Sequence, residues 1–150
     1  MKNHIICDGD QTLYRDVKTQ ISDEMLYVIH HLFLHGYDFG VISGTHASEI
    51  SRLMRSNEIK YSHHILANSG SSYHFHNNGK LNKVYEFELS KEDKNKIFNA
   101  LELLVNEFNI KPVTGKYDQL QDRGSQITLS ALGRNAPIEQ KNSYDPSRKK

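Results

Sequence analysis

Residues 4–13 read HIICDGDQTL and place two aspartates, Asp8 and Asp10, at the end of a short apolar run. The apolar run at 5–7 predicts a buried β-strand, and Gly9 predicts where the strand gives way to a loop. Side chains two residues apart in an extended chain project the same way, so both carboxylates are expected to face one small volume. They repel each other unless a cation lies between them or one of them holds a proton. Mg²⁺ is commonly held by one or two carboxylates together with a substrate phosphate, and the segment therefore points to phosphoryl chemistry.

The composition narrows the class of protein. The chain has 150 residues, 37% of them hydrophobic and 25% charged, with a formal net charge of +1, which gives no electrostatic case for a nucleic-acid partner. No apolar run approaches the length of a membrane span, and the N-terminus lacks the apolar stretch of a secretory signal. The single cysteine, Cys7, excludes an intrachain disulfide framework and favours a reducing, cytoplasmic setting. The nine histidines are scattered without a third ligand at metal-binding spacing, so none is assigned to a metal.

The first part of the chain alternates short apolar strands with amphipathic helices. Ser22 and Thr45 are expected N-caps for two helices, and Gly36 is an expected C-terminal stop for the first. This order predicts an α/β fold with a parallel, doubly wound sheet, in which ligands collect at the carboxyl ends of the strands. The expected elements are strands at 4–8, 37–43 and 63–67 and helices at 23–35 and 46–55.

All three expected strands end in small or polar residues, as a phosphate pocket requires. Their agreement favours a ligand site more strongly than any single motif does. The residues are Asp8 and Asp10, then Ser43 and Gly44, then Asn68, Ser69 and Gly70.

The pattern changes after residue 70. Asn77-Asn78-Gly79 separates two alternating runs and predicts a hairpin, and Ser90 with Asp93 predicts a capping box that opens a helix to about 107. A further strand is expected at 125–132, followed by a polar, turn-rich segment. Residues 87–150 therefore predict an α+β unit distinct from residues 1–86. The apolar stripe of the helix is expected to comprise Ile97, Leu101, Leu104 and Phe108.

Other readings of the first motif fail on counting. The C-x5-R signature of cysteine phosphatases would need arginine where Leu13 stands. A calcium loop starting at Asp8 would need glycine at Leu13 and glutamate at Thr19. No phosphate-binding GxxxxGK[ST] loop occurs, and a two-component receiver would need aspartate where the third strand ends in Asn68.

The remaining pattern resembles the haloacid dehalogenase (HAD) superfamily of phosphatases and phosphomutases. Its first motif is a hydrophobic strand running into D-x-D-x-T, which residues 8–12 match, and its second is a hydrophobic strand ending in Ser or Thr, which Ser43 matches. The commonest first motif has Gly after the second Asp, where this chain has Gln11. The resemblance implies a Rossmann-like core, present in part, with an inserted α+β cap.

The second part is similar to the IIB branch of that superfamily. The stretch ANSGSSYHFHNNGKL resembles its junction between core and cap, and DRGSQITLSALGRNAPIEQK resembles the cap of phosphomannomutases. Cap arginines of that family grip the phosphosugar, and the matching positions are Arg123 and Arg134. A third falls on Lys141, which keeps the charge but loses the bidentate fork of arginine.

The resemblance implies roles for these residues. Asp8 would be the nucleophile and Asp10 the general acid and base, with Mg²⁺ held by Asp8 and the backbone carbonyl of Asp10. Ser43 and Gly44, before the next helix, would bind phosphate, and the cap cations would select a phosphorylated sugar. Hydrolase and mutase chemistry both remain open.

One departure concerns the later motifs of the family. Its third-motif lysine and fourth-motif acidic pair follow the cap, and no GDxxxD-like segment occurs here. We therefore expect the N-terminal part of a longer enzyme, whose sheet would need partner chains, such as a homodimer, or a rearrangement. From another class, the chain could be a catalytically silent module that binds phosphate or Mg²⁺ or serves in assembly. The aspartates, Ser43, Asn68 and the arginines also remain open to a reading as turn residues and surface charges.

Overall fold

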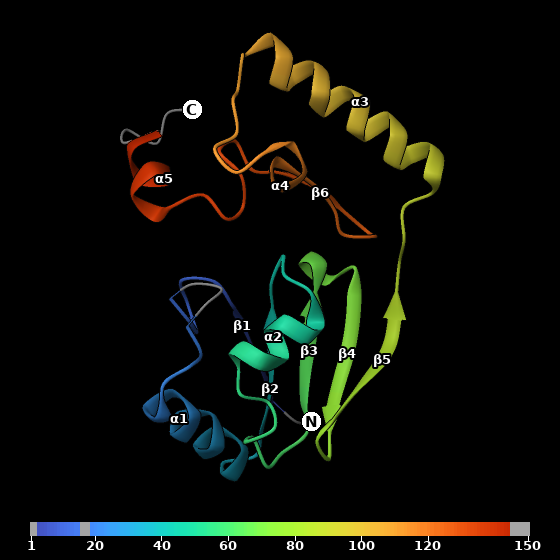
Figure 1. Ribbon diagram of the computed structural model, residues 1–150. Coiled ribbons are helices and arrows are strands. Elements are labelled where there is room, and N and C mark those ends of the chain that lie inside the picture. Colours follow the sequence, from blue (N-terminus) through green and yellow to red (C-terminus); the bar gives the residue numbers. More distant parts are fainter. Residues whose placement is uncertain (1–2, 16–18, 145–150) are drawn as a thin grey trace. The chain divides into compact units, whose positions relative to one another are not determined.

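In the computed structural model, which describes residues 3–15 and 19–144, the chain divides into two units, Met1–Phe87 and Glu88–Lys150. Each unit has its own sheet (Figure 1).

The sheet of the first unit has five strands in the order of the sequence. The first three are parallel, and the last two add a hairpin in antiparallel pairing (Figure 1). The hairpin turn has Asn78 and Gly79 at φ +49° and +72°, which is the left-handed conformation that an Asn-Gly turn supplies. The strands are β1 (Asn3–Asp8), β2 (Tyr37–Ile42), β3 (His63–Ala67), β4 (Ser72–Asn77) and β5 (Lys80–Glu86).

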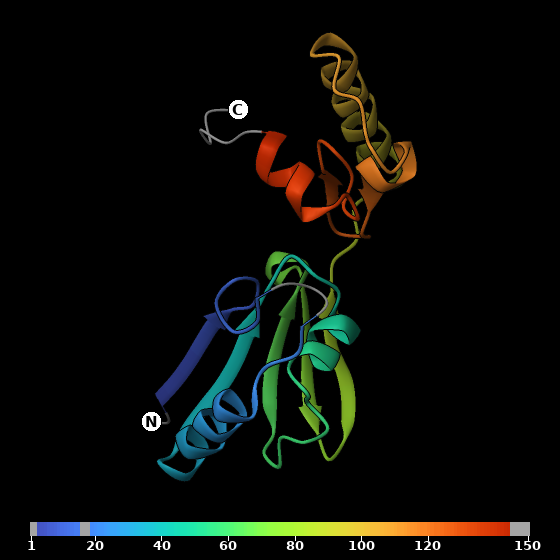
Figure 2. The ribbon, with the colours of Figure 1, turned by 60° about the vertical axis from the view of Figure 1, so that its left-hand side comes forward.

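Two helices, α1 (Asp23–Leu34) and α2 (Ala47–Leu53), lie on the same face of this sheet (Figure 2). Parallel strands that follow one another in order, joined by crossovers of one hand, place their helices on one side. The α/β class and the partial Rossmann-like core are thus confirmed. The winding runs one way only within the described residues, and the second helical layer of a doubly wound sheet is not among them.

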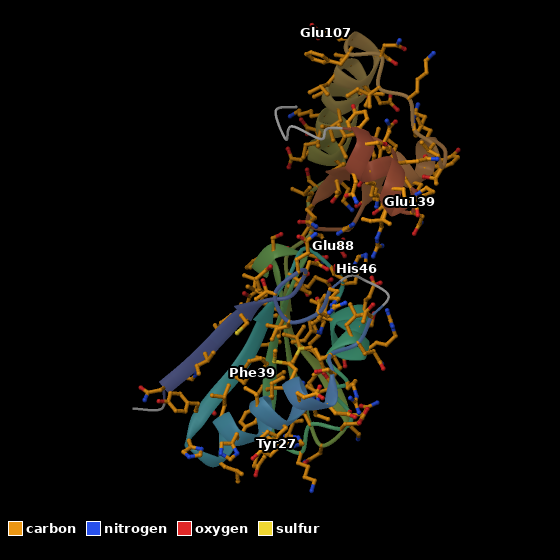
Figure 3. The ribbon with its side chains drawn as sticks, turned by 90° about the vertical axis from the view of Figure 1, so that its left-hand side faces the viewer. Tyr27, Phe39, His46, Glu88, Glu107 and Glu139 are labelled. Atoms are coloured by element: carbon orange, nitrogen blue, oxygen red, sulfur yellow. The ribbon has the colours of Figure 1, made fainter. Side chains whose placement is uncertain are left out.

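The core of the first unit lies between the sheet and these helices. Phe39 of β2 is buried there with Ile29 of α1 and Ile50 of α2, whereas Tyr27 of α1 is exposed (Figure 3). On the other face Ile6 of β1 is 55% exposed, since no helix of the described part of this unit covers it.

Local signals placed the ends of α1 correctly. The hydroxyl of Ser22 accepts a hydrogen bond from the N–H of Met25 at 3.2 Å, and the N–H of Gly36 donates to the carbonyl of Phe33. The prediction of Thr45 as the next N-cap is wrong, because His46 holds that position. The buried Thr45 instead accepts a hydrogen bond from the N–H of Asn68 with its carbonyl.

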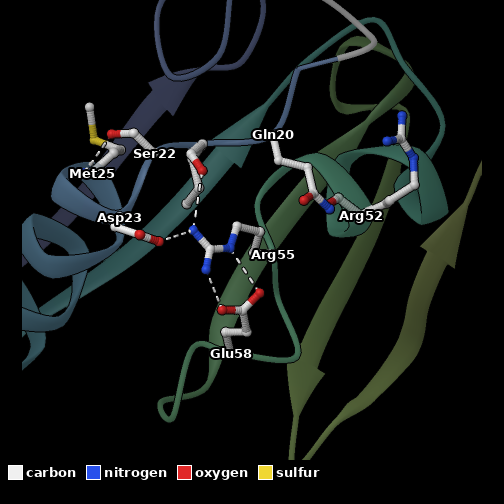
Figure 4. Close-up of polar contacts among 8 residues, drawn as sticks. Gln20, Ser22, Asp23, Met25, Arg52, Arg55 and Glu58 are labelled. Atoms are coloured by element: carbon white, nitrogen blue, oxygen red, sulfur yellow. Dashed lines mark hydrogen bonds and ion pairs between the residues drawn. The ribbon is translucent and has the colours of Figure 1, made fainter.

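The segment that enters α1 is tied to the end of α2 (Figure 4). The guanidinium of Arg55 donates to the carboxylates of both Asp23 and Glu58. The N–H of Ile21 donates to the carbonyl of Leu53 at 2.9 Å. These contacts join the start of α1 to the end of α2 and so stabilise the helical layer that covers the sheet.

The second unit consists of short elements around one long helix. Ser90 caps that helix as predicted, because the N–H of Asp93 donates to Ser90 Oγ, which in turn donates to Asp93 Oδ2. The expected strand at 125–132 is shorter than predicted, and the polar segment after Gly133 contains a helix that was not predicted. The elements are α3 (Lys91–Glu107), α4 (Lys116–Gln119), β6 (Leu120–Asp122), β7 (Ile127–Leu129) and α5 (Ile138–Tyr144).

The apolar stripe of α3 is only partly covered. Ile97 and Leu101 are half-buried, but Leu104 and Phe108 are 40% and 67% exposed, so the second half of the predicted stripe is open to solvent. The β6–β7 hairpin has three residues in each strand and covers only part of the helix. None of the described helices combines the length and apolar character that a membrane span requires.

Candidate active site

The carboxyl ends of the three parallel strands are joined by backbone hydrogen bonds. The N–H of Gly9 donates to the carbonyl of Ile42, and the N–H of Ser43 donates to that of Leu66. The carbonyl of Ser43 accepts from the N–H of Ser69 at 2.9 Å. The polar residues at these strand ends therefore gather at one edge of the sheet.

Asp8 and Asp10 each accept a hydrogen bond from a hydroxyl group at this edge. Ser43 Oγ donates to Asp10 Oδ2 at 3.2 Å, and Thr12 Oγ1 donates to Asp8 Oδ2 at 3.3 Å. Ser43 Oγ also accepts from the N–H of Thr45. Asp8 is exposed, Asp10 is half-buried and Ser43 is buried. The carboxylate of Asp8 is therefore open to a ligand, whereas that of Asp10 is bound on its buried side by Ser43.

The loop after β1 closes tightly around the carbonyl of Gly9, which accepts hydrogen bonds from the N–H groups of Thr12, Leu13 and Tyr14. Gln11 lies in this turn with φ +58°, in the left-handed region that glycine adopts without cost. The position where the resembled family has glycine is thus one that needs this conformation. Gln11 adopts it against its own preference.

The buried side chain of Tyr14 packs beneath the aspartate motif. The sequence did not reveal this role of Tyr14. Its side chain is 4% exposed, and a Cβ built on Gly9 would overlap its hydroxyl and lie 3.2 Å from Ser43 Cβ. Burial raises the pKa of Tyr14 to about 12, opposed by the nearby Ser43 hydroxyl and helped by the charges of Asp10 and Asp8. The only signal in the sequence was the apolar pair 13–14 directly after the motif.

The donor set of this edge fits Mg²⁺. Each of the carboxylates of Asp8 and Asp10 accepts one hydrogen bond from a described side chain, and an ionised carboxylate has about four lone-pair sites. Unused oxygen sites therefore remain, and Asp8 presents its own to solvent. Hard oxygen donors in a partly open site are what a hydrated Mg²⁺ requires.

The predicted phosphate residues lie in the same place. Ser43 uses its hydroxyl proton on Asp10, and the half-buried Gly44 follows it in the loop before α2. Ser43 can bind a phosphate oxygen only by giving up or sharing its hydrogen bond to Asp10.

The predicted cap cations separate into two places within the second unit. Arg123 lies in the turn between β6 and β7, where its Nη2 donates to Gln121 Oε1 at 3.0 Å. Lys141 Nζ donates to the carbonyl of Arg134, whose N–H donates to the carbonyl of Asp118. The three residues of β6 lie between the two places, about 10 Å of extended chain. The structure therefore brings the Lys141 ammonium to the backbone of Arg134, whereas Arg123 lies at the other end of the β6–β7 hairpin.

A group of hydrogen bonds around the Asp118 carboxylate fixes the loop that contains Arg134. The sequence did not suggest this group. Asp118 accepts hydrogen bonds from Thr114 Oγ1 and from the backbone and side chain of Asn135. The bond from Thr114 is the largest cause that lowers the pKa of Asp118. Gly133 packs against Thr114 so closely, at φ +101°, that a Cβ there would overlap the Thr114 hydroxyl.

No protein-family model and no curated protein matches the chain. Solved structures do match. A phosphatase of the haloalkanoate (HAD) superfamily from Bacteroides thetaiotaomicron matches 73% of this chain with 16% identity and a TM-score of 0.53. A haloacid dehalogenase-like hydrolase from B. subtilis matches 69% with 18% identity and a TM-score of 0.55. The IMP-nucleotidase of Plasmodium falciparum matches 85% with 15% identity and a TM-score of 0.57.

These identities establish a shared fold and nothing finer. The matched region is 37%, 34% and 35% of the three solved chains, so the present chain spans about a third of their length.

Proposed function

Given that the chain has the fold of haloacid dehalogenase phosphatases, we propose that it takes part in Mg²⁺-dependent phosphoryl transfer on a phosphorylated sugar, through an aspartyl-phosphate. One observation supports the proposal: Asp8 and Asp10, two residues apart where β1 ends, accept hydrogen bonds from Thr12 and Ser43 respectively. The activity belongs to the whole protein, of which this chain supplies the nucleophile. The proposal includes a cytoplasmic setting and a possible homodimer.

Asp8 is the group placed to attack. It is exposed, and the hydrogen bond from Thr12 to Oδ2 restrains the carboxylate while leaving Oδ1 for the substrate. A bond forms between this oxygen and phosphorus as the bond from phosphorus to the sugar oxygen breaks. When bound at these carboxylates, Mg²⁺ would neutralise charge on the phosphoryl oxygens.

Asp10 is placed to move the proton. Ser43 donates to its Oδ2, so Oδ1 is the oxygen that can carry a proton to the leaving sugar oxygen. The same carboxylate then takes a proton from water, or from a sugar hydroxyl, as that oxygen attacks the phosphoaspartate. Ser43 thereby positions the acid and base.

Arg134 and Lys141 are the proposed selectors of the sugar phosphate, because they lie together on one loop and helix. A guanidinium binds phosphate with two parallel bonds, whereas an ammonium acts as a point charge. Arg123 would act from the opposite end of its hairpin. A requirement for a sugar 1,6-bisphosphate would indicate a mutase, and its absence a hydrolase.

A second candidate is a silent module that binds Mg²⁺ and phosphate without turnover. The observation that favours it is the length of the match, because the chain spans about a third of the solved phosphatases. It also lacks recognisable third and fourth motifs.

The test compares the protein with its Asp8→Asn variant and with Glu107→Gln as a control at an exposed site on α3. Phosphate release from a panel of sugar phosphates is measured with and without Mg²⁺, together with Mg²⁺ binding. We expect Asp8→Asn to lower Mg²⁺-dependent turnover by at least about 10³-fold, as loss of a nucleophile does, and Glu107→Gln to leave it unchanged.

The outcomes separate the candidates. Undiminished turnover in Asp8→Asn would refute the nucleophile. Mg²⁺ binding that depends on Asp8 but is never accompanied by turnover would favour the silent module. A protein that binds no Mg²⁺ at millimolar concentration would overturn both.

A further inference from the structure

Two histidines and a carboxylate converge on the uncovered face of the first sheet, at the end of the strands opposite the aspartate motif. They are His4 of β1, Asp38 of β2 and His64 of β3. One ligand atom from each lies within 4.8 Å of the other two, and His4 Nδ1 is 3.6 Å from Asp38 Oδ2. Sequence spacing did not reveal this cluster, because its members come from three separate strands.

The strand register explains why the side chains meet. His4 pairs with Asp38, and His64 pairs with Gly40, two residues further along β2 on the same face. Strands two apart in a sheet are separated by about 9.5 Å, yet the rings of His4 and His64 have centroids 6.2 Å apart. Gly40 permits this approach, because a Cβ there would lie 3.0 Å from His64 Cβ.

The surroundings suit a ligand set. The cluster borders a hollow of about 220 Å³ that is lined by apolar groups such as Ile6 and Leu66. His64 Nδ1 is 2.8 Å from the hydroxyl of Tyr73, an outer partner of the kind that fixes the tautomer of a ligating histidine. With Nδ1–H donating to Tyr73, Nε2 of His64 keeps its lone pair for a metal.

We propose that His4, Asp38 and His64 form a binding site for a divalent transition-metal ion, with Zn²⁺ as its probe. Two imidazoles and one carboxylate are a set that Zn²⁺ takes in proteins, with a fourth position open, whereas Mg²⁺ prefers oxygen alone. Ligand atoms of a tetrahedral zinc lie about 3.4 Å apart, close to the His4–Asp38 separation.

A bound ion would pin β1 to β2 and β3 across the open face. It would act at a site independent of the phosphoryl chemistry, since Asp8 is four residues away along β1, about 13 Å.

The test is a titration of the chain with Zn²⁺ alone, followed by calorimetry, and with Co²⁺, followed by its visible spectrum. We expect one tight site. His4→Gln, Asp38→Asn and His64→Gln should each weaken it by more than the 10–100-fold that loss of an outer partner such as Tyr73 costs, and Tyr73→Phe should fall within that range. His4 is exposed, so its variant tests the site even where His64→Gln fails to fold.

Two controls make the result decisive. His31→Gln interrupts the exposed histidine pair of α1, where the rings of His31 and His35 are 4.9 Å apart, and should leave the affinity unchanged. Asp8→Asn should also retain Zn²⁺ binding, so the two metal sites fail separately. Binding that survives in His4→Gln and His64→Gln, or that is lost in His31→Gln, would overturn the proposal.

Discussion

Acidification is expected to destabilise the first unit through His63, which is fully buried on β3. Its Nδ1 lies 3.0 Å from the carbonyl of Tyr61 and its Nε2 lies 2.9 Å from Ser56 Oγ. A carbonyl only accepts, so Nδ1 carries the proton and Nε2 accepts from the serine, which satisfies a neutral ring. The ring of His76 stacks on it at 4.7 Å, and burial disfavours the charge that a second ring proton would bring.

Burial lowers the pKa of His63 to about 4, with smaller contributions from His76 and His64 against the opposing Tyr61 carbonyl. The unfolded chain titrates near 6.5, so below that pH it binds a proton that the folded protein does not. The contribution of neutral His63 to the free energy of unfolding is therefore fully present above pH 6.5, and it is lost as the pH drops towards 4. Linkage gives a loss of roughly 1 kcal/mol at pH 5.5 and roughly 2–3 kcal/mol at pH 4.5.

The assay is urea unfolding at pH 7.5, 5.5 and 4.5 for the protein, for His63→Gln and for His35→Gln as an exposed control. His63→Gln loses buried hydrogen bonds and starts less stable, so the informative quantity is the change of unfolding free energy with pH. We expect that change to shrink by these amounts in His63→Gln alone. Equal pH dependence in all three proteins would refute the buried neutral ring.

Two further predictions concern the loop of the aspartate motif. Gly9→Ala should cost about 1–3 kcal/mol of stability, because the added Cβ overlaps the Tyr14 hydroxyl, and should cost less in a Tyr14→Phe background; equal costs in urea unfolding would contradict this packing. Gln11→Gly should raise the free energy of unfolding by up to about 1 kcal/mol, because Gln11 has φ +58°, which glycine adopts without strain. A loss of stability in urea unfolding would show instead that contacts of the Gln11 side chain stabilise the loop.

Local patterns were sufficient for the strands of the first unit and for most ends of the predicted helices. Ser22, Gly36 and Ser90 act as predicted because capping depends on neighbours a few residues away. The meeting of Ser43 with Asp10 also followed from the sequence, since ends of parallel strands share an edge. Thr45 failed as a cap because the helix begins at Ala47, which puts His46 at the N-cap position.

Packing across elements was beyond the reach of these patterns. Tyr14 under Gly9 depends on the path of a tight loop, and the Asp118 cluster depends on Gly133 reaching Thr114. The three-residue strand β6 is too short to show a periodicity. The site of His4 and His64 depends on a register between strands that side-chain periodicity alone does not fix.

The two proposed metal sites share one strand, and their donors determine how they compete. Asp8 contributes oxygen, whereas His4 contributes nitrogen, and a transition metal prefers imidazole where Mg²⁺ does not. Millimolar Mg²⁺ should therefore leave the affinity of the histidine site for Zn²⁺ unchanged while it fills the aspartate edge. If Mg²⁺ displaced Zn²⁺ in proportion to its concentration, both ions would be bound by the aspartates, and the histidines would be only neighbours in the sheet.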